Sequence, residues 1–249
     1  MKKIYFISDA HLGSLMVQNP REQELRLISF LDAIKEDAAE IFLLGDMFDF
    51  WFEYKTVVPK GQVRFLGKLA ELTDKGIVIH FFTGNHDLWT FGYLAEEIGL
   101  QVHKTPEIIE RGNKKFFLAH GDGLQDTDKG FAFIRWVFHN KVLQQLFSFV
   151  PPRIGLGFAK QWSKSNRKKD IAHAYGYQGE EKELLVQFAK KFSQQENIDF
   201  YIFGHRHILL DLQLAQKNRI VIIGDWLTLF SYAVWDGENL ELNQYEPTQ

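Results

Sequence analysis

The sequence predicts an α/β fold within a single domain that spans residues 1–249. Short apolar runs recur along the chain and end at Gly, Asp, Asn or His, as buried strands do. Stretches with a helical pattern lie between several of these runs, and this alternation is typical of α/β folds. A segment over 126–180 interrupts the alternation, and we expect it to form an inserted helical cap.

Six of the apolar runs have the length of buried strands. In chain order they are Ile4–Ile7, Ile41–Leu44, Ile77–Phe82, Lys115–Ala119, Phe200–Phe203 and Arg219–Ile223. Between them, Arg21–Ala39 and Gln62–Lys75 are predicted helices. Functional residues of open α/β sheets gather at the carboxyl ends of the strands, so the residues that follow each run are the candidates for a site.

Five clusters of Asp, His and Asn follow the predicted strands. They are Asp9-Ala10-His11, Gly45-Asp46-Met47-Phe48-Asp49, Gly84-Asn85-His86-Asp87, His120-Gly121-Asp122 and Gly204-His205-Arg206-His207. Residues i and i+2 of a strand share a face, so Asp9 with His11 can deliver two side chains to one point if the strand extends that far. The same holds for His205 with His207. Each cluster alone is typical of an ordinary turn, but the five together indicate the ligand set of a two-metal phosphoesterase.

Composition limits the chemistry of such a site. The chain has no cysteine, so disulfides, zinc–thiolate sites and thiol nucleophiles are excluded, and a metal must bind nitrogen and oxygen ligands. The net charge of −3 argues against a broad nucleic-acid surface, and we expect no nucleic-acid partner. The first apolar run is too short for a signal peptide or a membrane span, which favours a cytoplasmic location.

The predicted cap combines an unusually apolar helix with a basic run. The helix is expected from Phe131 to Val150, and its polar stripe is narrow. The basic residues that follow are Lys160, Lys164, Arg167, Lys168 and Lys169. A wide apolar face beside cations suits acyl chains and anionic headgroups, and predicts peripheral membrane contact. The alternative is a cap helix buried against the core, with a solvated basic end.

The clusters match the pattern D-x-H, G-D-x-x-D, G-N-H-D/E, a later His and G-H-x-H, so the chain resembles the calcineurin-like metallophosphoesterases. The resemblance implies a sandwich of two facing sheets flanked by helices, with two divalent metal ions at the strand ends. It makes Asp46 the bridging ligand. The remaining ligands that it implies are Asp9, His11 and His207 at one ion, and Asn85, His120 and His205 at the other.

Other polar residues of the clusters have less certain roles. We expect His86 to face the phosphate as an acid or electrophile, with Asp87 orienting it, and the alternative is a structural turn. Asp49 and Asp122 are candidates for contacts that orient the ligands. Three histidines lack partners in the sequence and are expected to be packing or surface residues: His80, His103 and His173.

Within that superfamily, the chain looks like the UDP-2,3-diacylglucosamine pyrophosphohydrolases of lipid A biosynthesis. The matching stretches are Gly45-Asp46-Met47-Phe48-Asp49-Phe50-Trp51, His120-Gly121-Asp122-Gly123-Leu124 followed by Asp126 and Asp128, and Gly224-Asp225-Trp226. One position departs from the pattern, because many of those enzymes have Arg after the metal-binding Asn, where this chain has His86.

This narrower resemblance implies hydrolysis of the pyrophosphate bond of UDP-2,3-diacylglucosamine to UMP and 2,3-diacylglucosamine 1-phosphate. It also implies Mn2+ as the metal and a peripheral location on the cytoplasmic face of the inner membrane. The implied substrate contacts are Asn85, Asp128, Ser163, Asn166 and Lys169. The alternatives are a phosphodiesterase or phosphatase that acts on soluble substrates, with His86 as the acid, and a scaffold without catalysis.

Overall fold

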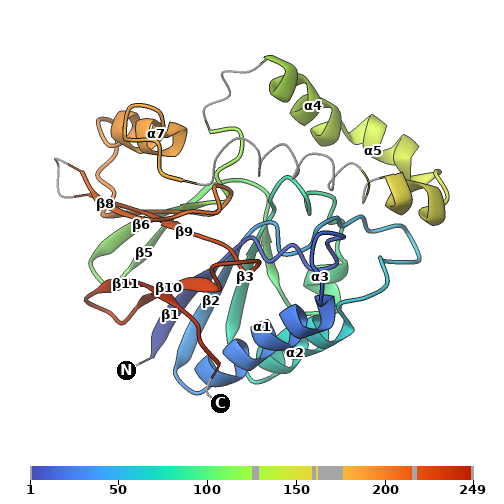
Figure 1. Ribbon diagram of the computed structural model, residues 1–249, viewed down its shortest axis with the longest axis horizontal. Coiled ribbons are helices and arrows are strands. Elements are labelled where there is room, and N and C mark those ends of the chain that lie inside the picture. The colour runs from blue at the N-terminus through green and yellow to red at the C-terminus, as the bar shows by residue number, and fades with distance from the viewer. Residues whose placement is uncertain (1, 125–128, 159–160, 162–175, 215–217, 248–249) are drawn as a thin grey trace.

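The computed structural model describes residues 2–124, 129–158, 161, 176–214 and 218–247. Two β-sheets face each other, and helices cover their outer faces (Figure 1). The predicted two-sheet α/β architecture is therefore confirmed. Among the described helices, none has both the length and the apolar character needed to cross a membrane.

The first sheet has six strands in the order β11-β10-β1-β2-β3-β4. The central strands pair in parallel, whereas β10 and β11 are antiparallel additions at one edge. Their bounds are β1 Lys3–Ile7, β2 Ala38–Leu44, β3 Val78–Phe82, β4 Gln101–His103, β10 Ser231–Trp235 and β11 Leu240–Gln244. Parallel pairing brings the carboxyl ends of β1, β2 and β3 to one edge of the sheet.

The second sheet has five strands in the order β5-β6-β7-β9-β8. Its three middle strands are parallel, and the two edge strands pair antiparallel to their neighbours. Their bounds are β5 Glu107–Arg111, β6 Lys114–Ala119, β7 Phe200–Phe203, β8 Leu209–Gln213 and β9 Arg219–Ile223. The carboxyl ends of β6, β7 and β9 thus form a second edge, which can meet the edge of the first sheet.

The core lies on both faces of each sheet. Phe6, Phe42 and Phe116 pack between the two sheets, with Phe6 stacked on both of the other rings. The neighbouring Tyr5 and Ile7 of β1 point to the opposite face and pack under the helices. Because both faces are buried, these strands are continuous apolar runs in the sequence, and this is why they could be predicted.

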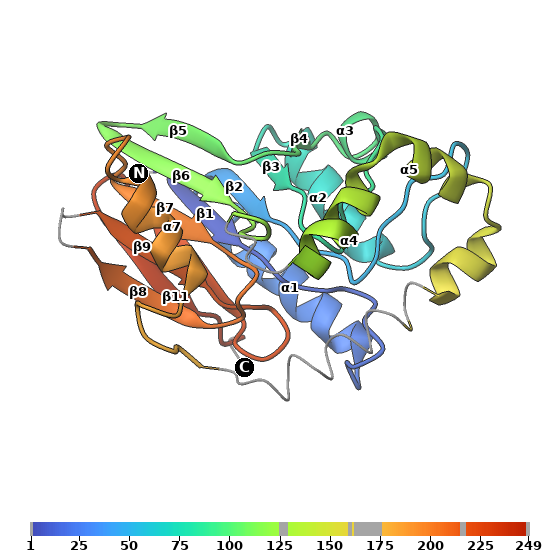
Figure 2. The ribbon, with the colours of Figure 1, turned by 90° about the horizontal axis from the view of Figure 1, so that it is seen from above.

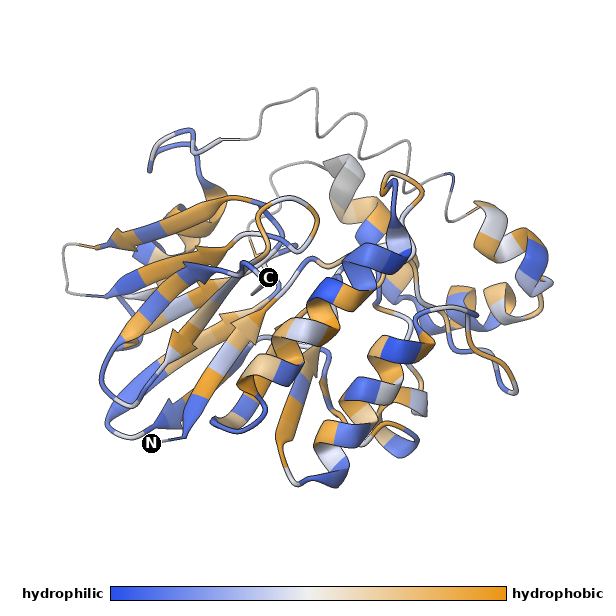
Figure 3. Cartoon of the chain, turned by 60° about the horizontal axis from the view of Figure 1, so that its bottom comes forward, coloured by the Kyte–Doolittle hydropathy of each residue, from blue (hydrophilic) through white to orange (hydrophobic). Residues whose placement is uncertain are grey.

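Helices cover the outer faces of the sandwich. Those on the first sheet are α1 Pro20–Ile34, α2 Val63–Asp74 and the short α3 Tyr93–Glu96, and α7 Leu184–Phe192 covers the second sheet. Figure 3 shows polar and apolar residues alternating along the helices, whereas the central strands are largely apolar and the edge strands are mixed. The expected helix over Arg21–Ala39 was too long, because the chain leaves α1 after Ile34 and enters β2 at Ala38.

The predicted cap region contains two helices, α4 Lys129–His139 and α5 Lys141–Ser148, so the expectation of one helix from Phe131 to Val150 was wrong. The break lies at Asn140, whose side chain accepts hydrogen bonds from the backbone N–H groups of Val142 and Leu143 and so caps α5. Residues 152–158 form a further helical segment. Figures 1 and 2 show α4 and α5 outside the two sheets.

Candidate metal centre

The five clusters lie on loops directly after β1, β2, β3, β6 and β7, and hydrogen bonds between backbones join these loops. Asp9 N donates to Gly45 O at 3.0 Å, which ties the loop after β1 to the loop after β2. Gly204 N donates to His120 O at 2.9 Å within the second sheet. The loop after β9 joins them through Trp226 N, which donates to Asp9 O at 3.1 Å. The carboxyl edges of both sheets therefore converge on one site.

Five of the predicted metal ligands have left-handed backbone conformations. The φ angles are 54° at Asp9, 43° at His11, 53° at Asp46, 66° at His205 and 49° at His207. Such angles are uncommon for residues other than glycine. The strands do not extend far enough for strand alternation to pair residue 9 with 11 and 205 with 207, because β1 ends at Ile7 and β7 ends at Phe203. Sharp turns after the strands bring these side chains together.

One group of side chains consists of Asp9, His11 and His207. The Nε2 atoms of the two imidazoles are 3.3 Å apart. Oδ1 of Asp9 lies 3.3 Å from Nε2 of His207 and 3.5 Å from Nε2 of His11. Three potential ligand atoms from two sheets therefore surround one point.

A second group consists of Asp46, His120 and His205. His120 Nε2 lies 3.3 Å from Asp46 Oδ2 and 3.2 Å from His205 Nδ1. The same Oδ2 of Asp46 lies 3.8 Å from Nε2 of His11, which belongs to the first group. Asp46 thus stands between the two groups, in the position that a bridging carboxylate requires.

These residues fit a pair of divalent cations. In each group two imidazole nitrogens face each other at 3.2–3.3 Å, an arrangement that a cation between them would satisfy. Asn85 Oδ1 is buried without a hydrogen-bond partner among the described residues, and a metal ion would satisfy it. Imidazole, carboxylate and amide ligands without thiolate suit Mn2+, Fe2+, Zn2+ or Mg2+.

Electrostatics couples the buried acids and histidines. Burial disfavours the charged forms, but the attraction between them is stronger: His207 lowers the pKa of Asp9, and His120 lowers that of Asp46. Burial also opposes the imidazolium of His207, yet Asp9 and Asp225 raise its pKa to about 10. Burial and the nearby His120 lower the pKa of His205. Without metal, the site holds protons that a cation would displace.

Hydrogen bonds on the outer side of the imidazoles determine which nitrogen faces the centre. His120 Nδ1 donates to Leu44 O at 2.8 Å, and His86 Nδ1 donates to Asp49 O at 2.7 Å. His207 Nδ1 lies 3.2 Å from Asp225 Oδ2. In all three rings Nε2 is therefore left for the centre, as second-sphere bonds commonly arrange for metal-binding histidines.

His86 lies at the edge of the centre and is partly exposed. Its ring meets His11 edge-on, with the ring centroids 4.9 Å apart, and its backbone N–H donates to Asp46 Oδ1 at 2.8 Å. His86 also forms a possible ligand group with His11 and Asp46. Since Nδ1 must donate to a carbonyl, His86 can act as an acid at Nε2 only when both nitrogens carry protons.

The expected role of Asp87 in orienting His86 was wrong. The buried Asp87 carboxylate accepts hydrogen bonds from the backbone N–H groups of Asp46, Met47, Phe48 and Gly84. Burial and the neighbouring Asp46 raise the pKa of Asp87 to about 7. Asp87 therefore joins the loops after β2 and β3, and the carbonyl of Asp49 orients His86 in its place.

Two contributors to the centre were not predicted as site residues. Asp225 is buried and bonds His207, and Ser8 Oγ donates to Asp9 Oδ2 at 2.6 Å. Asp225 follows the apolar run of β9, as the five clusters follow theirs, and that position was the available signal. Gly204 approaches so closely that a Cβ there would overlap Ser8 and Asp9, which explains the glycine.

The remaining predictions fall partly outside the centre. Burial opposes the charge of His120, but Asp46, then Asp9 and finally Asp122 raise its pKa. His80 is buried and stacks on Phe42, so it is a packing residue, as expected. Several predicted residues lie outside the described part of the chain: Asp126, Asp128, Ser163, Asn166, Lys169, His173 and the rest of the basic run.

An apolar cavity of about 180 Å³ lies between the cap and the core. Its lining residues are Phe50, Trp89, Val137, Phe138, Leu143, Phe147 and Phe158. A smaller space lined by Asn85 and His86 shares Phe50, Trp89 and Phe138 with it. Trp89 Nε1 donates to Phe138 O at 2.8 Å and so joins core to cap. An apolar chamber therefore begins beside the candidate metal centre.

Comparison with known proteins agrees with this geometry. The family model of the calcineurin-like phosphoesterases matches residues 2–209. The UDP-2,3-diacylglucosamine hydrolase of Porphyromonas gingivalis is 44% identical over 256 aligned residues, which cover 98% of each chain. The enzyme of that name from Haemophilus influenzae is 30% identical and covers 91% of each chain. The one from Histophilus somni is 29% identical over 91% of this chain and 93% of its own.

Proposed function

The chain belongs to the calcineurin-like phosphoesterase family, and we propose that it hydrolyses the pyrophosphate bond of UDP-2,3-diacylglucosamine in lipid A biosynthesis. The products are UMP and 2,3-diacylglucosamine 1-phosphate. The observation that carries this proposal is the apolar cavity beside Asn85 and His86. When the pyrophosphate of this substrate binds at the metal centre, its acyl chains lie next to that cavity. A small soluble substrate has no apolar group that would fill it.

In this proposal two divalent ions, with Mn2+ preferred, bind the side chains of the two groups. Asp46 would contact both ions, Asp9, His11 and His207 would hold one, and Asn85, His120 and His205 would hold the other. When bound, such ions supply an activated water and the positive charge that stabilises phosphoryl transfer. The buried carboxylates are surrounded by imidazoles and an amide, which limits the negative charge that an anionic substrate meets.

The partly exposed residues at the edge of the centre receive the substrate. His86, held at Nδ1 by Asp49 O, turns Nε2 toward a phosphate oxygen. Asn85 contacts the phosphate as well as an ion. Asp128, Ser163, Asn166 and Lys169 complete the substrate contacts that we propose.

We also propose that the protein works on the cytoplasmic face of the inner membrane, as a peripheral protein. The cap presents apolar side chains to solvent, with Val142 64%, Leu146 58% and Phe149 77% exposed. Clustered apolar side chains of this size are suited to an interfacial helix. Sedimentation with anionic liposomes tests this proposal. Replacing all three residues with Ser should reduce the fraction of protein that sediments with the liposomes, and an unchanged fraction would count against this docking face.

Product analysis tests the activity directly. Purified protein loaded with Mn2+ is incubated with UDP-2,3-diacylglucosamine, and UMP is measured by chromatography, with Asp46→Ala as the control. We expect UMP from the wild type and a loss of at least about a hundredfold in the variant, because the bridge between the ions is gone. Absence of UMP with retained hydrolysis of a simple phosphodiester would replace the lipid substrate with a soluble one.

A further inference from the structure

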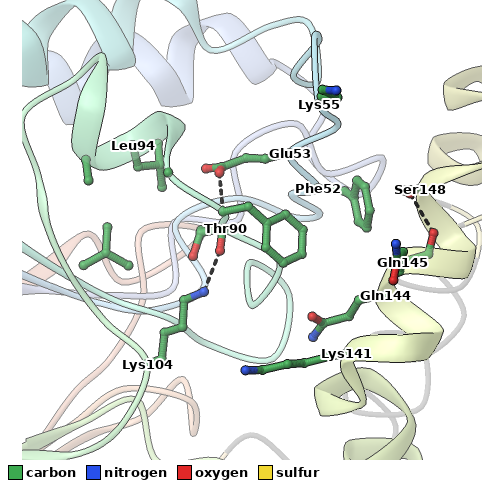
Figure 4. Close-up of a pocket in the computed structure, with 14 residues that line it drawn as sticks. Phe52, Glu53, Lys55, Thr90, Leu94, Lys104, Lys141, Gln144, Gln145 and Ser148 are labelled. Atoms are coloured by element: carbon green, nitrogen blue, oxygen red, sulfur yellow. Dashed lines mark hydrogen bonds between the residues drawn. The ribbon is translucent and has the colours of Figure 1, made fainter.

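A second cavity, of about 900 Å³, lies on the other side of the cap helix α5. Its core side consists of Phe52, Glu53 and Lys55, of the segment around Phe91, and of Lys104 just after β4. Figure 4 shows these residues facing Lys141, Gln144 and Ser148 of α5 across the cavity. None of the predicted metal ligands lines it.

The helix α5 separates this cavity from the apolar one. The polar side chains of Lys141, Gln144, Gln145 and Ser148 follow the i, i+3, i+4, i+7 spacing of one helix face and line the large cavity. Leu143 and Phe147 lie on another face and line the apolar cavity. The ring centroids of Phe147 and Phe52 are 4.9 Å apart, and these two rings pack between the two cavities. The large cavity is therefore a separate site.

Three lysines and a single carboxylate give this cavity a positive charge: Lys55, Lys104 and Lys141 against Glu53. Glu53 is buried, and it accepts hydrogen bonds from Trp51 Nε1 and Tyr93 N at 3.1 Å, and from Phe91 N. Among the described residues, no ion pair is formed by Lys104 or Lys141. Partial burial and the charge of Lys141 lower the pKa of Lys104, although Glu53 opposes this. Both lysines therefore line one cavity with Glu53, whose carboxylate already accepts hydrogen bonds from three N–H groups.

The two lysines belong to different parts of the molecule. Lys104 Nζ donates to Thr90 O at 2.7 Å and lies 5.5 Å above the centre of the Phe91 ring, so the core holds it in place. An ammonium group has three donors, and two remain for a ligand. Lys141 extends into the cavity from the cap, toward the same space (Figure 4). Gln144 is held beside it, because its Nε2 donates to Phe138 O at 2.7 Å.

We propose that this cavity is a second binding site, specific for a phosphate group held between Lys104 of the core and Lys141 of the cap. Charge-assisted hydrogen bonds from both ammonium groups satisfy the phosphate oxygens and remove the repulsion between the lysines. The exposed Phe91 ring and the apolar side chains of Ala95 and Val102 offer a surface for the body of a phosphate ester. A bound phosphate links cap to core, and so restrains the wall of the apolar cavity.

Equilibrium dialysis of the metal-loaded protein with inorganic phosphate tests the site. Phosphate can also bind at the metal centre, so the number bound per chain is the decisive quantity. The double variant Lys104→Met/Lys141→Met should bind one phosphate fewer than the wild type. The single change Lys141→Met, at an exposed position, should raise the Kd of that phosphate about tenfold or more, and Lys141→Arg should restore it.

The exposed Lys60, which does not line the cavity, provides the matched control, and Lys60→Met should bind as the wild type does. Equal numbers of bound phosphates and equal Kd values in the wild type and the Lys141 variants would overturn the proposal. Because the site lies away from the metal centre, Lys141→Met should still release UMP. A failure of phosphate binding here therefore leaves the proposed hydrolysis untouched.

The phosphate can come from a soluble ester or from a lipid headgroup, and phosphatidylglycerol vesicles distinguish the two sources. If Lys141→Met binds the vesicles more weakly than the wild type, and free phosphate displaces the wild type from them, the source is the lipid. If the wild type and the variant bind vesicles equally, while phosphate binding still requires Lys141, the source is a soluble phosphate ester.

Discussion

Asp225 Oδ2 lies 3.2 Å from His207 Nδ1, and this contact turns Nε2 of the same ring toward Asp9 Oδ1, 3.3 Å away. The carboxylate of Asp225 is itself held by backbone N–H groups of Leu227, Thr228 and Leu229. The loop after β9 thus fixes a histidine that belongs to the loop after β7.

Replacing Asp225 should therefore weaken metal binding without removing a ligand. We expect Asp225→Ala to lower Mn2+ affinity about 10- to 100-fold, as loss of a carboxylate behind a metal-binding histidine commonly does. Isothermal titration calorimetry measures the affinity. Asp211→Asn, which removes a carboxylate at the surface that pairs with Arg219, is the control and should bind Mn2+ normally. Equal affinity in the two variants would show that Asp225 does not position His207.

Metal binding should strengthen as pH rises. Despite burial, Asp46 raises the pKa of His120, and Asp9 and Asp225 raise that of His207 to about 10. A metal ion must displace these protons, so the apparent affinity should rise about tenfold per pH unit for each proton released. Calorimetry in buffers of different ionisation enthalpy counts the protons. Binding near neutral pH that releases none would contradict this description of the centre.

The apolar cavity should determine selectivity for acylated substrate. Leu143→Gln places an amide in the cavity wall, and we expect the KM for UDP-2,3-diacylglucosamine in detergent to rise about tenfold or more. Hydrolysis of a simple phosphodiester should not change, because the metal centre is intact. Val63→Gln, at a solvent-exposed position of α2 away from the cap, is the matched control. An equal loss of activity on both substrates would mean that the substitution disturbs the metal centre.

Glu40 should contribute stability that disappears in acid. Burial opposes its charge, but hydrogen bonds from His80 and Arg111 outweigh burial and lower its pKa to about 2. A lowered pKa in the folded state stabilises the protein above the unfolded pKa, and this contribution is lost as pH falls from about 4.5 to about 2. The contribution is about 3 kcal/mol of unfolding free energy.

Urea denaturation at several pH values measures this contribution. Glu40→Gln should unfold more easily than the wild type above pH 5, and the two curves should converge toward about pH 2. Glu110→Gln removes a carboxylate that is 68% exposed, and should change stability little at any pH. A difference between wild type and Glu40→Gln that does not depend on pH would exclude the charge of Glu40 as its cause.

The six central strands could be predicted because both of their faces are buried. Strands that were missed have weaker patterns. β10 alternates between buried and half-buried residues, β8 alternates between exposed and half-buried residues, and β4 has only three residues. The division of the cap into α4 and α5 depends on Asn140, which is compatible with a helix and acts as a cap only through its side-chain geometry. A sequence does not show which of these two roles an asparagine takes.

The clusters of the centre could be predicted from their positions after strands, because chemistry gathers at that edge of a sheet. The backbone geometry could not, since Asp and His are enriched at left-handed angles but adopt ordinary angles far more often. The hydrogen-bond partners of Asp87 could not be predicted either. Three of its four backbone donors lie about 40 residues earlier, in the loop after β2, and the fourth belongs to its own loop. The structure brings the predicted ligands together, and their role as ligands remains a prediction.

The two faces of α5 restrict how this segment can change. Lys141, Gln144 and Ser148 face one cavity while Leu143 and Phe147 face the other, and only their angular positions around the helix keep the two sets apart. Inserting or deleting one residue after Lys141 would rotate the rest of the helix by about 100°, so glutamine or serine would enter the apolar cavity and leucine or phenylalanine the charged one. Each face of α5 tolerates substitution by residues of the same polarity. The helix does not tolerate the insertion or deletion of a single residue, because that would exchange the two faces.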